Sequence, residues 1–111
     1  MISESLERQS VINIYEIDQL DEVPNAEKID LCLLDLMSTH HRPKAVISVI
    51  KSCFPNSKVI ALHIYTLPEL IRPIIEEGVD GYLTYDPSRT ELIQAIQEVL
   101  SGGTYLPLDP K

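Results

Sequence analysis

The sequence has no apolar stretch approaching the roughly 20 residues that a membrane-spanning helix requires. The first four residues, Met1 to Glu4, lack the basic start of a signal peptide. Basic residues are also scarce, 9 against 17 acidic ones, so the formal charge is −8. No cluster of Lys and Arg interrupts this acidic pattern, and the chain should repel a phosphate backbone. We therefore expect a soluble, cytoplasmic protein that binds neither a membrane nor nucleic acid directly.

Cysteine is almost absent, since only Cys32 and Cys53 occur in 111 residues. Cys32 falls in a predicted buried strand and Cys53 near a predicted helix end, where a free thiol behaves as a small apolar group. We expect no disulfide and a reducing environment. No acid–base partner is fixed beside Cys32, and no other residues form a catalytic constellation, so we expect no enzymatic activity. Internal repeats are missing too, and the length suits one domain.

Short apolar segments predict four β-strands. The most apolar of them, residues 30–36, contains Asp35 near its end and is typical of a parallel strand that is buried on both faces. Sites in open α/β sheets lie at the carboxyl ends of the strands, which makes Asp35 the first candidate site residue. The other predicted strands are residues 11–17, 58–63 and 80–85.

Helical patterns separate these strands. Residues 41–54 should direct one apolar face at the sheet, made of Ala45, Val46, Val49, Ile50 and Cys53. Short helices are also predicted at residues 3–9 and 18–28, the latter interrupted or delayed by Pro24.

Two capping boxes predict the later helix starts. Thr66 and Glu69 open one helix, which should end at Gly78 and be kinked or partly unwound at Pro73. Ser88 and Glu91 open the last helix, which should end at Gly102 and Gly103. Its core-facing stripe should be Leu92, Ile93, Ile96, Val99 and Leu100.

Strands that alternate with helices predict an α/β protein with an open parallel sheet and helices on both faces. We assign residues 1–107 to this domain and residues 108–111 to a short C-terminal tail. From Thr104 onward, two prolines and no periodicity indicate a surface strap or the start of a linker.

Three segments resemble motifs of one protein family, in the family's order. Residues 30–36 resemble its central "DLVLLDL", residues 76–83 its "EAGADGYL", and residues 101–107 the segment that leaves its last helix. On these motifs the sequence resembles a response-regulator receiver domain of the NarL/FixJ class, in the CheY-like superfamily, over about residues 3–107. The resemblance implies a flavodoxin-like fold and puts Asp35 at the phospho-accepting position.

The sequence departs from this family around Asp35. The family's first strand, with the acidic pair that holds Mg²⁺, is missing, so we expect a truncated, four-stranded receiver. His63 stands where the family has threonine or serine, and Tyr85 stands where it has lysine. Each charged hydrogen bond lost is worth roughly 1.5–3 kcal/mol, so phosphorylation should slow by several powers of ten. The resemblance thus implies a degenerate pseudo-receiver that uses no cofactor.

Histidines near Asp35 allow further interpretations. His63 and Asp35 should end neighbouring strands. A charged hydrogen bond between them could occupy the vacant pocket that holds the phosphoryl group in the family. His63 could equally be a surface residue with no specific role. Together with His40 and His41 it could form a metal cluster, but histidines in a loop are usually solvated, and we expect no metal site.

The resemblance also implies an interaction face, formed in receivers by the fourth helix, fifth strand and fifth helix. On it we place Leu70, Ile74, Tyr82 and Glu91, with Tyr82 resembling the family's switch aromatic. Tyr85 contributes an amphipathic ring of a kind common at interfaces, although ordinary packing would explain both tyrosines equally well.

A missing strand would leave unpaired backbone at a sheet edge. Either residues 11–17 pair beside residues 30–36, or a second chain fills the gap, and we expect a homodimer. The expected function is a signalling module that binds a histidine kinase, a response regulator or a transcription factor. Two alternatives stay open: a slow phospho-acceptor that uses Asp35, and the receiver part of a DNA-binding regulator. The chain could also be a fragment of a longer protein.

Overall fold

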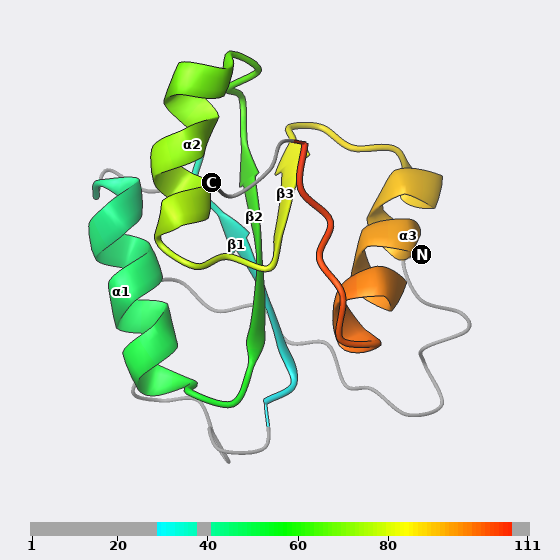
Figure 1. Cartoon of the computed structure of the whole chain (residues 1–111), viewed down its shortest axis with the longest axis horizontal. Helices are drawn as coiled ribbons and strands as arrows, with labels where there is room; N and C mark the ends of the chain where they lie inside the picture. The colour runs from blue at the N-terminus through cyan, green and yellow to red at the C-terminus, as the bar shows by residue number, and fades with distance from the viewer. Residues whose placement is uncertain (1–28, 38–40, 108–111) are drawn as a thin grey trace.

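A computed structural model describes residues 29–37 and 41–107. The strand expected at residues 11–17 and the helices expected at residues 3–9 and 18–28 lie outside the described residues, as does the tail. In the described part, three parallel strands form one sheet in the order β1 (Leu31–Asp35), β2 (Lys58–His63) and β3 (Gly81–Thr84) (Figure 1). The carboxyl ends of all three strands therefore lie at one edge of the sheet, with Asp35 opposite Leu62 in the register.

Helices cover both faces of this sheet, as predicted. The helices α1 (Pro43–Cys53) and α2 (Pro68–Glu76) lie on one face, and α3 (Arg89–Leu100) lies on the other (Figure 1). Successive side chains of a strand point to opposite faces of the sheet, so β2 contributes side chains to two cores. Val59 and Ala61 pack in the core under α1 and α2, whereas Ile60 packs in the core under α3. The α/β class and the parallel sheet are confirmed. Three strands lie in the described residues, against the four expected.

The helix α1 is rotated relative to the face predicted for it. Its buried residues are Val46, Ile47 and Ile50, whereas Ala45 is exposed and Val49 is 44% exposed. Both stripes satisfy three- and four-residue spacing, because apolar residues occur at 45, 46, 47, 49 and 50. Periodicity could not decide between them, and the prediction of Ala45 and Val49 as core residues was wrong.

The helix ends agree with the sequence in part. The Ser88 hydroxyl accepts a hydrogen bond from the Glu91 backbone N–H at 3.1 Å, which confirms this cap. The Thr66 cap is wrong: α2 has Leu67 at the capping position with no side-chain cap, and Pro68 supplies the first helical residue. The helix continues through Pro73 to Glu76. Gly78 follows with φ of +98°, the conformation expected of a glycine after a helix.

The strand β1 is less buried than expected. β1 is partly buried rather than buried on both faces, and Leu33 is 40% exposed, because β1 lies at one end of the described sheet.

The segment after α3 extends the sheet at its opposite end, beside β3. Tyr105 donates its backbone N–H to the Asp80 carbonyl at 3.0 Å and accepts from the Tyr82 N–H at 2.9 Å. Residues 104–107 thus pair with the sheet at Tyr105, a role that their lack of periodicity did not indicate.

In α3 the predicted stripe is correct for Ile96 and Val99, which are buried. Leu100 is 41% exposed, so its assignment to the core was wrong. The predicted stripe omitted Ala95, which is fully buried with Ile60 and Leu83 in the second core.

Candidate functional site

Asp35 ends β1 and is partly buried at the carboxyl edge of the sheet. Its Oδ1 atom accepts a hydrogen bond from the Met37 backbone N–H at 2.9 Å. The next residue, Leu36, donates its N–H to the Leu62 carbonyl at 2.9 Å, so sheet pairing extends one residue beyond Asp35. This pairing fixes the position of the carboxylate beside the end of β2.

His63 ends β2 at the same edge. Its Nδ1 atom accepts a hydrogen bond from the Ile64 N–H at 2.9 Å, so the neutral ring carries its proton on Nε2. The imidazole also stacks on the Tyr65 ring, with the centroids 4.1 Å apart and the planes inclined by 21°. These two contacts hold the imidazole in one orientation.

The charge state of His63 depends on two opposing effects. Burial lowers its pKa from the ordinary value of 6.5, and the nearby Asp35 carboxylate raises it by a smaller amount. The net pKa is lowered, so His63 is mainly neutral at neutral pH. Asp35 and His63 therefore interact electrostatically, as their expected positions at neighbouring strand ends implied.

We expect Asp35→Asn to lower the pKa of His63 further, because it removes the carboxylate that favours the imidazolium. Histidine signals followed by NMR across a pH titration would measure this change.

In the wild type the unfolded chain binds the His63 proton more tightly than the folded chain does. The contribution of His63 to folding stability is therefore present above pH 6.5 and decreases as the pH falls below it. A higher pKa of His63 in the variant would contradict the assigned contacts.

The other predicted pocket residue, Tyr85, has an exposed ring, with 47% of the residue accessible. Its backbone N–H donates to the His63 carbonyl at 2.8 Å, which places it directly beside the end of β2. The backbone of residue 85 therefore lies close to the edge of the sheet that carries Asp35 and His63.

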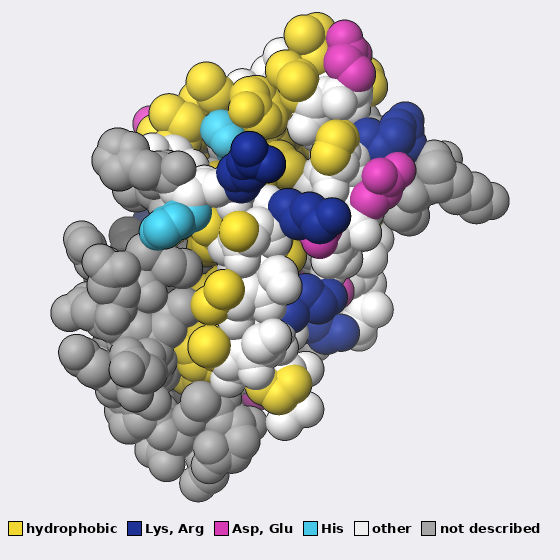
Figure 2. Space-filling view, turned by 90° about the vertical axis from the view of Figure 1, so that its left-hand side faces the viewer, with side chains coloured by type: hydrophobic (Ala, Val, Ile, Leu, Met, Phe, Trp, Pro, Cys, Tyr) yellow, Lys and Arg dark blue, Asp and Glu magenta, His cyan; other side chains and the backbone are white. Residues whose placement is uncertain are grey.

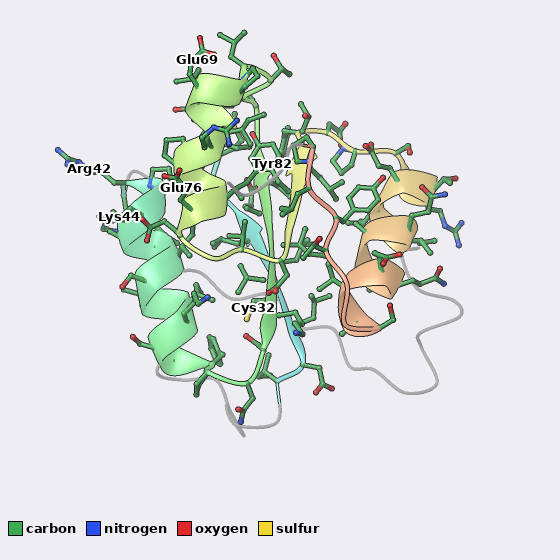
Figure 3. All side chains as sticks on the ribbon, in the orientation of Figure 1. Cys32, Arg42, Lys44, Glu69, Glu76 and Tyr82 are labelled. Carbon is green, nitrogen blue, oxygen red and sulfur yellow. The ribbon has the colours of Figure 1, made fainter. Side chains whose placement is uncertain are left out.

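The residues of the predicted interaction face separate into two groups. Tyr82 is 2% exposed and Ile74 is 3% exposed, so both belong to the core rather than the surface. Tyr82, which is labelled in Figure 3, donates its hydroxyl to the Tyr65 carbonyl at 2.8 Å. Burial raises the pKa of Tyr82 to about 12. Leu70 is 42% exposed and Glu91 is partly exposed, so these two reach the surface.

Sequence reasoning missed Tyr65, which links the two predicted sites. Its ring stacks on His63, and its carbonyl accepts the hydrogen bond from Tyr82. The available signal was an aromatic residue two positions after the end of a buried strand, where it stays at the same edge.

The described residues do not by themselves fit a Mg²⁺ site. They contain no group of three or more His, Cys, Asp or Glu side chains that could hold a metal ion, and Asp35 already accepts a backbone hydrogen bond. Mg²⁺ requires octahedral oxygen ligation. Of the histidines considered for a metal cluster, His41 is exposed and His40 lies outside the described residues.

Both cysteines are free. The Cys32 Sγ atom lies 3.4 Å from the Ser57 hydroxyl. The pKa of this thiol is raised, mainly because the thiol is partly buried. The raised pKa favours the protonated thiol, and Cys32 packs against the core under α1 and α2.

Exposed apolar side chains gather where the strands end. We define the carboxyl-edge cluster as five residues that are each between 42% and 53% exposed: Met37, Ile64, Leu67, Leu70 and Tyr85. Met37 follows β1, Tyr85 follows β3, and the other three lie between β2 and the first turn of α2. In Figure 2 apolar atoms crowd the top of the molecule, over the start of α2. Exposed apolar side chains that gather at one edge are a candidate contact surface.

In the part of the chain that the structure describes, no helix has the length and apolar character needed to cross a membrane.

No family model matches the chain. Solved structures identify its fold as that of response-regulator receiver domains. The isolated receiver domain of RcsB from Salmonella enterica serovar Typhimurium superposes with a TM-score of 0.71 and 19% identity, over 96% of this chain and 82% of that one. A response regulator from Thermotoga maritima gives a TM-score of 0.69 and 22% identity, over 91% of this chain and 86% of that one.

Sequence relatives are bacterial regulatory proteins. The chain is 33% identical over 78 residues to the transcriptional regulatory protein LnrK of Bacillus subtilis, covering 70% of this chain and 36% of LnrK. It is 30% identical over 83 residues to the oxygen regulatory protein NreC of Staphylococcus carnosus, covering 74% of this chain and 37% of NreC. The chain thus spans little more than a third of the length of these relatives.

Proposed function

We propose that this protein is a receiver-fold signalling module that acts through protein–protein contact rather than through Mg²⁺-dependent phosphorylation of Asp35. The single observation that carries the proposal is the arrangement beside Asp35. His63 and Tyr85 stand where the family resemblance puts a hydroxyl and a lysine, and His63 is held against Tyr65. Its Nδ1 already accepts a backbone hydrogen bond.

Phosphoryl transfer adds negative charge to the acceptor, and donors aimed at that charge lower the barrier. A largely neutral imidazole and an exposed phenol offer weaker stabilisation than an ammonium group and a fixed hydroxyl. The carboxyl-edge cluster offers an apolar contact surface at the same place. The partner classes in this proposal are a histidine kinase, a response regulator, a transcription factor and a second copy of the chain.

Two other functions have specific support. Asp35 ends β1 at the carboxyl edge, and the family resemblance puts it at the phospho-acceptor position, which favours slow phosphorylation as a second candidate. The chain spans about a third of LnrK, a transcriptional regulatory protein, which favours the receiver part of a larger regulator.

Acetyl phosphate with Mg²⁺ tests the proposal directly. We expect no stoichiometric phosphoryl adduct on the wild-type chain by intact mass, because the charge-stabilising groups at positions 63 and 85 differ from those of the family. The Asp35→Asn variant is the background control. A stoichiometric adduct that is present in the wild type and absent from Asp35→Asn would establish the slow phospho-acceptor instead.

A further inference from the structure

The segment after α3 leads the chain to the carboxyl edge of the sheet. We call residues 104–107 the strap. Tyr105 pairs with Gly81 as a parallel bridge, so the residues that follow it run in the same direction as β3. In Figure 1 the strap, coloured red, lies beside β3 and ends near the carboxyl end of that strand. The chain therefore leaves the described fold at the edge that holds the carboxyl-edge cluster.

Contacts on both faces of the sheet fix the direction of the strap. Tyr105 packs against the core under α3, and Leu106 packs against the core under α1 and α2. Before the strap, Gly102 has φ of +101° and Gly103 donates its N–H to the Glu98 carbonyl at 3.0 Å, which reverses the chain after α3. Packing and hydrogen bonds thus set the point from which the residues beyond the strap start.

Two residues of the carboxyl-edge cluster lie within reach of this exit. Tyr105 lies opposite Gly81, so the end of the strap is about two residues, or about 7 Å, short of Tyr85 along the sheet. The Tyr85 N–H bonds to the carbonyl at the end of β2 at 2.8 Å, so Tyr85 and Ile64 leave the ends of neighbouring strands. A residue spans at most about 3.5 Å, so residues 108–111 can extend roughly 14 Å beyond the strap. This length suffices to cover both side chains.

The composition of residues 108–111 suits an apolar contact without net charge. Leu108 is apolar, and Asp109 and Lys111 have opposite charges. Pro110 restricts the backbone, which lowers the entropy cost of docking. A second copy of the chain would carry the same charge of −8 and be repelled, whereas a segment tethered at the edge has an effective concentration of roughly millimolar or above. Charge and tethering therefore favour the chain's own tail as the occupant.

We propose that residues 108–111 fold over the carboxyl-edge cluster, with Leu108 packed against Ile64 and Tyr85, and that a protein partner displaces them when it binds this surface. Burial of a leucine side chain favours the docked arrangement roughly tenfold. The tail then shields the apolar side chains from water while no partner is bound. This inference rests on the proposed function, because the surface that the tail covers is the contact surface assigned there.

Leu108→Ser in the full chain tests this contact. The amide NMR signals of Ile64, Leu67 and Tyr85 should shift, because the variant lacks the leucine that covers this part of the cluster. Binding of the dye ANS, which reports exposed apolar surface, should rise about twofold. Thermal melts of the variant and the wild type establish that both are folded.

The matched control is Leu100→Ser, which removes another leucine, 41% exposed, at the end of α3. It should leave the amide signals of the cluster unchanged and should not raise ANS binding. Shifts in Leu108→Ser that are confined to residues 104–111 would overturn the inference, as would equal changes in the two variants. Cluster signals that depend on protein concentration, and still do so in Leu108→Ser, would assign the surface to a second copy instead. The acetyl phosphate test is independent of these outcomes.

Discussion

The double variant His63→Thr/Tyr85→Lys is expected to acquire a phosphoryl group at Asp35 about 100-fold faster than the wild-type chain. A lysine and a hydroxyl would donate to the developing negative charge, and each charged hydrogen bond is worth roughly 1.5–3 kcal/mol, or about tenfold to hundredfold in rate. The backbone permits this, because Tyr85 N–H bonds to the His63 carbonyl and both residues lie at the edge that holds Asp35. Intact mass followed over time with acetyl phosphate and Mg²⁺ measures the rate.

Two controls make this experiment specific. His63→Thr/Tyr85→Leu has the hydroxyl without the cation and should gain at most about tenfold. Asp35→Asn in the double variant should abolish the adduct. If the wild-type chain reacts as fast as the double variant, the residues at positions 63 and 85 do not limit phosphorylation, and the pseudo-receiver proposal is wrong.

Ile47→Ala should lower the free energy of unfolding by about 2–5 kcal/mol. Ile47 is 0% exposed and packs in the core between α1 and the sheet, so the substitution removes apolar contacts and leaves a cavity. A loss of this size is a large part of the roughly 5–15 kcal/mol that stabilises a typical domain. Urea unfolding followed by circular dichroism measures it.

Val49→Ala is the matched control for Ile47→Ala on the same helix. Val49 is 44% exposed, so its substitution should change stability by less than about 0.5 kcal/mol. This pair distinguishes the observed face of α1 from the face that periodicity predicts. A larger loss for Val49→Ala than for Ile47→Ala would show that α1 packs by the predicted face.

The sequence predicted the described elements well, since each depends on local chemistry. The runs 30–36, 58–63 and 80–85 are short and apolar, and each contains a strand of the structure. Ser88 provides the predicted cap because its hydroxyl needs only the nearby Glu91 N–H. Thr66 failed as a cap because Pro68 defines the start of α2. The strand at residues 11–17 stays a prediction.

The candidate site was predicted less completely. Placing Asp35, His63 and Tyr85 at one edge requires only that parallel strands end together, and the structure confirms that they do. Tyr65 was missed because its two contacts join residues on β2, β3 and the loop between β2 and α2.

The sequence alone determined which segments are strands and helices, where Asp35 lies in its strand, and that the sheet is parallel. The elements and the position of Asp35 follow from spacing and capping within a few residues, and the parallel sheet follows from the alternation of strands with helices along the chain. Only the tertiary structure decided that Ile47 rather than Val49 is buried, that Tyr82 belongs to the core, and that Tyr105 pairs with the edge of β3. The physical reason is that the burial of a side chain depends on the elements packed against it, and residues distant in the sequence supply them.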